Sequence, residues 1–202
     1  MKKLLLTLFV TIIIGTAAKA QFDNKITAQF SIGVSTVTGP DGLTDFFDSG
    51  MSFDGGLQYN FNRNFSLVGL VKYATLWSAE YYEDYLIVAG LDNLGISLAP
   101  KYRFRAGKKL QPYVLGGVSL NYITYSIAVT DLDLSYSEIF PAALGYIGAA
   151  GLEYGLSNNI SLFTQVGTNG VLFDDGALGY DNLSTIFLQF GLNLNLFKSK
   201  SL

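Results

Sequence analysis

The sequence contains no cysteine and no histidine, and only 14% of its 202 residues are charged. Without cysteine the chain can form no disulfide, no thiolate-bound zinc site and no cysteine nucleophile. Without histidine it can carry neither a Ser-His-Asp triad nor an imidazole-bound metal. Glycine, phenylalanine and tyrosine are abundant instead, at 22, 15 and 13 residues. This composition argues against disorder, and the length fits one domain or two small ones.

A long apolar run is also missing, and a membrane-spanning helix would need about 20 apolar residues. The longest apolar stretch, residues 4–14, follows two lysines and precedes an A-x-A cleavage motif at residues 18–20. A stretch of this length with these flanks is typical of a secretory signal peptide rather than of a membrane anchor. We therefore expect residues 1–20 to be a cleaved leader and residues 21–202 to be the mature domain.

The rest of the sequence alternates between apolar and polar residues with a period of two, which is typical of β-strands. In the segment 184–197, Ile186 and Leu188 share one face and Gln189 lies on the other, whereas Phe187 breaks the pattern. The runs are about twice as long as the ~5–6 residues of an ordinary strand, and a strand that crosses a membrane needs ~9–11. Eight such runs are expected, at residues 26–37, 51–61, 65–77, 91–104, 110–125, 143–156, 160–172 and 184–197.

The connections between these runs are alternately long and short. Long loops are expected at residues 38–50, 78–90, 126–142 and 173–183, and short polar turns at 62–64, 105–109 and 157–159. Short turns at one end and long loops at the other are typical of an up-and-down barrel in an outer membrane. We therefore predict an all-β fold, an eight-stranded antiparallel up-and-down transmembrane β-barrel. The even number of strands places both ends of the barrel chain at the periplasmic, short-turn end.

An internal repeat is consistent with a closed sheet. Residues 56–67 and 151–162 share the pattern G-L-[QE]-Y-x-[FL]-x-x-N-[FI]-S-L, with an offset of 95 residues. Each copy predicts a strand, a tight polar turn and the start of the next strand. We interpret the repeat as one hairpin unit used on opposite sides of the barrel rather than as a binding motif.

The leader, these two hairpins and the segment 100–113, with its PKYRF and QPY motifs, resemble the outer-membrane β-barrel domain family. The similarity is to the eight-stranded OmpA/OmpX-type barrels and, more closely, to their PorT-like branch, and it covers residues 24–197. It implies contacts with outer-membrane lipid or lipopolysaccharide and insertion by the barrel-assembly machinery. It implies no cofactor and supplies no catalytic residue. Members usually end on an aromatic residue, whereas here Phe197 is followed by five further residues.

The polar face of the strands carries charged residues, and these indicate which face points inward. An Arg or Lys that faces lipid at the midplane of a membrane costs ~2–4 kcal/mol. The polar face is therefore predicted to line the lumen and the apolar face to contact lipid. We expect an interior charge network in which Glu153 pairs with one or more of Lys72, Lys101 and Arg103. A structural plug of salt bridges is favoured because side chains fill eight-stranded barrels, and a selectivity filter or gate is the alternative.

Aromatic residues on the apolar face gather near the ends of the predicted strands. This placement predicts two interfacial girdles of the kind that flank the apolar band of outer-membrane barrels. The predicted girdle at the turn end comprises Tyr59, Phe61, Phe65, Tyr102, Phe104 and Tyr154, and the one at the loop end Tyr73 and Trp77.

The four long loops carry twelve Asp and Glu and no Lys or Arg. An acidic outer rim disfavours nucleic acid as a partner, because it repels phosphates. The loop 38–50 contains three Asp without the spacing of a calcium-binding loop, so we interpret it as a solvated loop and expect no metal site. The loop 78–90 is rich in aromatic residues, which either contact a protein or carbohydrate partner or only extend the girdle. These candidate contact residues are Trp77, Tyr81, Tyr82 and Tyr85.

Together these features predict a non-enzymatic protein of the bacterial outer membrane with a structural or interaction role. Envelope integrity, adhesion or an accessory role in secretion, exerted through the extracellular loops, all fit this prediction. One alternative is a narrow pore for small solutes or ions, and another is a secreted lipocalin-like ligand carrier with its apolar face inward. Outer-membrane enzymes of this size, such as lipid acyltransferases, phospholipases and omptin-like proteases, rely on a histidine that this chain lacks.

Overall fold

The computed structural model describes residues 26–44, 46–47, 49–82, 85–129, 134–157, 159–172 and 182–196. The predicted signal peptide at residues 1–20 lies outside the described residues, as do Phe197 and most of the loop 173–183. None of the helices in the described part of the chain is long and apolar enough to cross a membrane.

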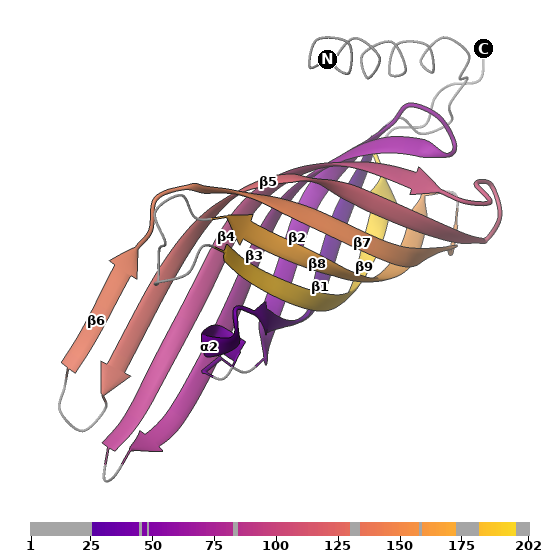
Figure 1. The fold of residues 1–202 in the computed structure, drawn as a ribbon. Coiled ribbons are helices and arrows are strands. Elements are labelled where there is room, and N and C mark those ends of the chain that lie inside the picture. Colours follow the sequence, from indigo (N-terminus) through magenta and orange to yellow (C-terminus); the bar gives the residue numbers. More distant parts are fainter. Residues whose placement is uncertain are drawn as a thin grey trace, which may run out of the picture.

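The described residues form nine strands and one short helix, α2 (Asp41–Thr44). The strands are β1 (Ile26–Gly39), β2 (Ser49–Asn60), β3 (Phe65–Tyr82), β4 (Tyr85–Arg103), β5 (Leu110–Val129), β6 (Leu134–Ile139), β7 (Ala143–Gly155), β8 (Ile160–Leu172) and β9 (Asn182–Asn195). Antiparallel neighbours follow the order β4-β3-β2-β1-β9-β8-β7-β5, and β4 also pairs with β5, which closes the sheet (Figure 1). The predicted eight-stranded antiparallel barrel is therefore confirmed, and each predicted run falls on one of its strands.

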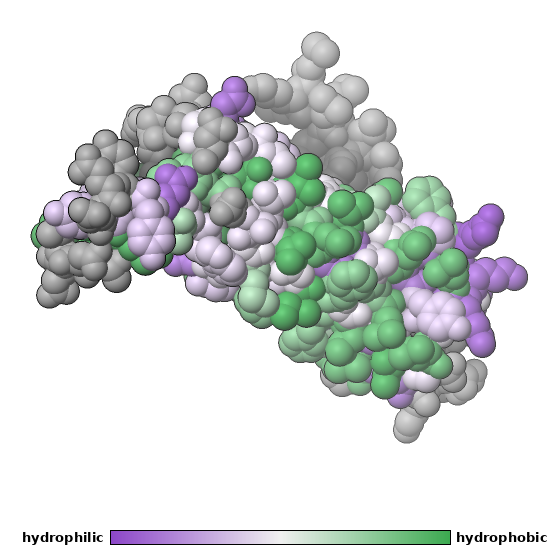
Figure 2. All heavy atoms as spheres, turned by 90° about the horizontal axis from the view of Figure 1, so that it is seen from below, coloured by the Kyte–Doolittle hydropathy of each residue, from purple (hydrophilic) through white to green (hydrophobic). Residues whose placement is uncertain are grey.

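The two faces of the barrel wall differ as the alternation predicts. On β1, Phe30 and Ile32 are about half exposed on the outer surface, whereas Gln29 and Ser31 are buried. Figure 2 shows one face of the wall, on which hydrophobic residues cover the middle and hydrophilic ones gather at the turn end. The apolar face thus points outward, as predicted. A lipocalin-like carrier needs the reverse arrangement, with an apolar interior around its ligand, so that alternative is wrong.

The predicted loops at 78–90 and 126–142 are wrong, because both segments continue largely as strands. β3 runs on to Tyr82, β4 begins at Tyr85, and β6 pairs with the end of β5. β2 pairs with β3 only as far as Leu76, so the residues beyond it have left the barrel and satisfy their backbone groups by pairing with each other. We call this extension, at the lower left of Figure 1, the protruding sheet; it comprises residues 77–82, 85–90, 126–129 and 134–139.

The prediction of a solvated loop at 38–50 is also wrong, because this connection covers the mouth of the barrel. Leu43 and Phe47 turn inward and are only 7% and 3% exposed. The Phe47 ring packs edge-on against Phe46 and Tyr125, at 5.2 and 6.3 Å between ring centroids. The loop buries these side chains because the inner wall at the rim is itself apolar. We call this cluster the apolar plug; its buried members are Val37, Leu43, Phe47, Leu76, Ala89, Leu91, Ile123, Phe140, Ala143, Val171 and Leu183.

Candidate functional site

Glu153 is the centre of a buried ion-pair network near the turn end of the barrel. Its Oε2 atom lies 3.2 Å from Lys101 Nζ and 3.2 Å from Arg103 Nε. Its Oε1 atom accepts a hydrogen bond of 2.7 Å from the Ser161 hydroxyl. Lys101 and Arg103 point to the same side of β4 because they are two residues apart, and Glu153 reaches them from β7. The structure thus brings together three of the four residues of the predicted network.

Arg103 extends this network to the far wall of the lumen. Its guanidinium donates hydrogen bonds to Asn60 Oδ1, at 3.2 and 3.3 Å, and to Ser66 Oγ, at 3.0 Å. The amide of Asn60 in turn donates to Thr27 Oγ1 at 3.2 Å. Side chains from β1, β2, β3, β4, β7 and β8 are thereby connected inside the barrel. A buried polar network of this extent favours one arrangement of the strands over others.

Lys101 connects the network to the middle of the barrel. Its Nζ atom lies 3.9 Å from the centroid of the Tyr113 ring, a distance at which a cation is attracted to the ring face. The Tyr113 hydroxyl donates to Gln165 Oε1 at 2.9 Å, and Gln165 Nε2 donates to Gln189 Oε1 at 2.7 Å. Gln189 Nε2 then donates to Ser52 Oγ at 3.1 Å. Polar side chains therefore link the ion pairs to strands on several sides of the lumen.

Lys72 lies apart from Glu153, in a second charged site that is nearer the loop end of the barrel. Its Nζ atom is 3.8 Å from the centroid of the Phe187 ring, and its cross-strand neighbour is Asp54 on β2. Asp54 is a charged residue that the sequence analysis did not assign to the network, although it lies on the polar face of its run. The same contact explains why Phe187 breaks the apolar pattern of the last strand: its ring is 1% exposed inside the barrel.

Apolar side chains fill the lumen at two levels. The apolar plug closes the loop end, and a second cluster lies nearer the middle of the barrel. The second cluster is formed by Val68, Leu70, Ala99, Tyr113, Leu115, Ile147, Phe163 and Phe187. A hydrated path along the lumen would have to pass the side chains of both clusters, which offer water few hydrogen-bonding partners. The geometry of the interior therefore fits a plugged barrel better than an open channel.

The candidate contact residues of the loop 78–90 divide between the two faces of the protruding sheet. Trp77 and Tyr81 lie on one face of β3, at 47% and 79% exposed, whereas Tyr85 pairs with Tyr82 and lies on the other face. The side chain of Tyr82 is outside the described part of the structure. Tyr136 on β6, which the sequence analysis missed, is 55% exposed on the same face as Tyr85. The alternation of apolar and polar residues in 134–138 is the sequence feature that could have identified Tyr136 as part of a strand.

Tyr136 has an acidic neighbour on its own strand. Its hydroxyl donates a hydrogen bond of 2.9 Å to Glu138 Oε2. This bond, together with the negative charge of the carboxylate, raises the pKa of the Tyr136 hydroxyl above its usual value. The outer strand of the protruding sheet thus presents a neutral aromatic ring beside an acidic group.

Aromatic rings also gather at the turn end of the outer wall. Tyr59 packs edge-on against Phe61 at 5.0 Å between centroids, Phe61 lies 5.6 Å from Phe65, and Tyr102 lies 5.1 Å from Phe104. Such a belt marks the membrane interface of a barrel. At the loop end, Tyr73 is 41% exposed on the outer wall, and Trp77, on the same face of β3 where the protruding sheet begins, is 47% exposed.

The acidic residues of the connection 38–50 do not form a metal site in the part that the structure describes. Asp41 is described, whereas Asp45 and Asp48 are not. Across the described ranges, no three acidic, histidine or cysteine residues come together as possible metal ligands.

The comparisons with known proteins agree with this architecture. A model of the outer membrane protein beta-barrel domain matches residues 4–195. The chain belongs to this family. Membership of the outer-membrane β-barrel family implies a location in the bacterial outer membrane. No curated protein matches the chain significantly.

Several solved structures share the fold of this outer-membrane β-barrel. Neisserial surface protein A superposes with a TM-score of 0.62 at 17% identity, covering 85% of this chain and 97% of its own. The attachment invasion locus protein Ail of Yersinia pestis gives 0.52 at 15% identity, with coverages of 86% and 100%. The outer membrane protease OmpT of Escherichia coli gives 0.50 at 10% identity, with coverages of 89% and 100%. At these identities the likeness shows the fold alone.

We expect this outer-membrane β-barrel to pass no current when the full chain is inserted into a planar lipid bilayer. The reason is that the ion-pair network and two apolar clusters occupy its lumen. Single-channel recording measures this directly, on protein that migrates faster on a gel before boiling than after it. Boiled protein serves as the background control. Discrete current steps that are absent from the boiled sample would contradict the plugged interior and favour the pore.

Proposed function

We propose that this outer-membrane barrel is a non-enzymatic surface protein that binds a protein partner through its protruding sheet, in an adhesive role. The observation that carries the proposal is the protruding sheet itself. It extends beyond the barrel rim with exposed aromatic rings and unpaired strand edges, while the lumen below it is filled. Among the described residues, it is this sheet that reaches beyond the rim, which supports a binding surface rather than a channel.

The outer edge of β6 supplies backbone groups for a partner. β6 pairs with β5 from Thr124↔Ile139 to Val129↔Leu134, and no described strand pairs with its other side. All six residues of β6 are exposed. An unpaired edge of this kind accepts an extended segment of another protein, which adds to the sheet through main-chain hydrogen bonds. An edge strand without Lys or Pro lacks the usual protection against such pairing.

Side chains on the protruding sheet indicate the chemistry of the partner. Tyr81 and Trp77 expose large rings, which bury much area at a low cost in side-chain entropy. Glu80 and Glu138 lie on the same sheet, and the long connections carry no Lys or Arg. Charge complementarity therefore favours a partner segment with basic side chains. The name of Ail, an attachment and invasion protein, provides a precedent for adhesion on this fold.

We expect deletion of residues 78–86 to abolish partner binding and to leave the barrel folded. The deletion removes the tip of the β3–β4 hairpin with Tyr81 and Tyr85, but the pairs from Leu76↔Leu91 down to Phe65↔Tyr102 remain. The probe is a set of peptides selected against the full chain from a random peptide library. Binding of these peptides is measured for the full chain and the deletion variant, and a faster-migrating unboiled band verifies folding.

A double substitution sharpens this test. Trp77→Ala with Tyr81→Ala should weaken peptide binding by about tenfold or more, which is the size of a hot-spot loss. Tyr102→Ala with Phe104→Ala removes an aromatic pair from the opposite end of the wall and should leave binding unchanged. The proposal further requires that the selected peptides be enriched in Lys and Arg. Equal binding by the full chain and both variants, with folding intact, would refute the assignment of the binding surface.

A further inference from the structure

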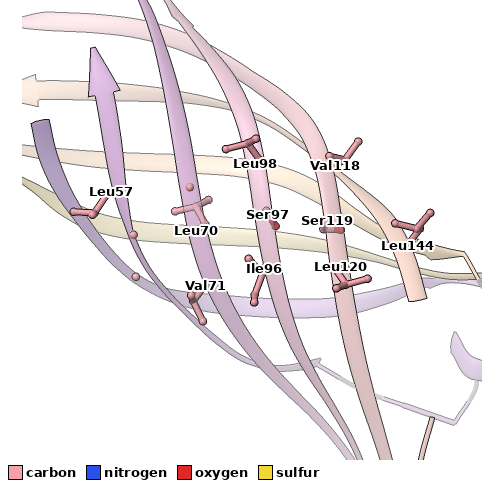
Figure 3. A pocket seen from close by; sticks show the side chains of 13 residues that line it. Leu57, Leu70, Val71, Ile96, Ser97, Leu98, Val118, Ser119, Leu120 and Leu144 are labelled. Carbon is pink, nitrogen blue, oxygen red and sulfur yellow. The ribbon is translucent and has the colours of Figure 1, made fainter. Parts of the chain in front are cut away.

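The outer wall of the barrel contains a hollow of about 580 Å³. It lies across β2, β3, β4 and β5 and reaches Leu144 on β7 (Figure 3). Its side walls are branched aliphatic side chains that point outward, including Leu57, Val71, Ile96 and Val118. Ser97 and Ser119 also border it, but both are turned inward and buried. The hollow therefore presents almost only hydrocarbon.

The position of the hollow along the barrel places it against the membrane interior. On β3, the lining residues 69–71 lie between Phe65 of the turn-end belt and Tyr73 near the loop end. On β4, residues 96–98 lie on the loop side of Tyr102. The apolar band between the aromatic belts of such a barrel contacts the tails of membrane lipids. The hollow thus opens toward hydrocarbon chains rather than toward water.

Two glycines that face outward leave this space empty. Gly55 lies across from Val71, and Gly69 lies across from Leu57. A Cβ atom at Gly55 would meet nothing closer than the Phe30 ring at 3.8 Å, and one at Gly69 nothing closer than the Leu57 carbonyl oxygen at 3.9 Å. The packing of the barrel would therefore tolerate side chains at both positions. The glycines are needed for the hollow and not for closure of the sheet.

We propose that this hollow holds the hydrocarbon tail of a membrane lipid at a fixed position on the wall. A tail that enters the hollow contacts aliphatic side chains from several strands, whereas a tail on a flat wall contacts one side only. The additional dispersion contacts favour the bound tail over its neighbours. No charged side chain lines the hollow, so the lipid is recognised through its tail and not through its headgroup. The volume lies within the ~300–1,000 Å³ of ordinary ligand sites.

The test uses the full chain in phosphatidylcholine vesicles that contain a small fraction of lipid with a diazirine midway along one tail. After irradiation, the labelled peptides are mapped on the strands. We expect labelling to concentrate on the lining residues of the hollow, and to be lost there when Gly55→Leu and Gly69→Leu fill it. Both variants should keep the faster-migrating unboiled band, because the new side chains point outward.

The matched controls are Gly116→Leu and Gly148→Leu. These glycines pair with each other on β5 and β7 and do not line the hollow, and a Cβ atom there meets nothing closer than 3.8 and 4.0 Å. Labelling of the hollow should be unchanged in both. Even labelling around the wall, or labelling that persists after the hollow is filled, would overturn the proposal. Absence of lipid adducts from the lining residues of the hollow in the unchanged chain would also overturn it.

Discussion

Replacing Glu153 with glutamine is expected to lower the free energy of unfolding of the barrel by about 3–5 kcal/mol. The carboxylate is the partner of both Lys101 and Arg103, at 3.2 Å from each. These two cations are only 1% and 7% exposed, so water cannot take over the role of the missing carboxylate. Glutamine keeps the shape of the side chain but leaves two positive charges buried without a counter-charge.

This loss is measured by urea unfolding of the full chain in lipid vesicles, with the fluorescence of Trp77, the one tryptophan of the chain, as the signal. The matched control is Glu138→Gln on β6, where the residue is exposed and the change should stay within about 0.5 kcal/mol. The same variants recorded in planar bilayers separate the two interpretations of the network. A structural plug loses stability and remains silent, whereas a gate would begin to conduct. Equal stability of Glu153→Gln and the unchanged chain would contradict the plug.

The barrel strands could be predicted because the membrane gives each residue one of two environments. A side chain on a spanning strand faces either lipid or lumen, so apolar and polar residues alternate over long stretches, as Phe30 and Ile32 do around Ser31. The partners of Glu153 could be narrowed to the polar face for the same reason. Which of these residues pairs with Glu153 depends on how neighbouring strands are shifted along one another around the barrel. The alternation of apolar and polar residues does not reveal that shift. That shift places Lys72 across from Asp54 rather than beside Glu153.

The protruding sheet and the apolar plug could not be predicted by the same argument. Beyond the rim, both faces of a strand can meet water, so the sequence need not alternate between apolar and polar residues. On β3, Trp77 and Tyr81 lie on one face, and the other face carries both polar and aromatic residues. The plug depends on residues that are distant in the sequence: Phe47 belongs to the same buried cluster as Phe140 and Leu183. The sequence feature that pointed to the plug was the pair of phenylalanines in the acidic connection 38–50, because a solvated loop would not be expected to contain them.

Substitution of either glycine at the seam between β1 and β9 is expected to prevent closure of the barrel. This seam joins the first and last strands, and Gly33 lies across from Gln189 while Gly191 lies across from Ser31. A Cβ atom at Gly33 would collide with the Leu188 carbonyl oxygen and lie 2.6 Å from Gln189 Cγ. One at Gly191 would collide with both the Phe30 carbonyl oxygen and the Phe163 ring. Because the colliding oxygens belong to the backbone, only separation of the strands relieves the clash.

We therefore expect Gly33→Val and Gly191→Val to yield no faster-migrating unboiled band after folding into vesicles, whereas Gly116→Val and Gly148→Val should yield it. The controls change the same residue type to the same side chain on barrel strands, but their side chains point toward lipid and meet nothing closer than 3.8 Å. The comparison separates two effects on the stability of the folded barrel: the replacement of glycine by valine as such, and the collision of an inward-pointing side chain with the backbone. Normal folding of the two seam variants would mean that the strands can move apart locally without opening the sheet. The close approach of β1 and β9 would then not be what closes the barrel.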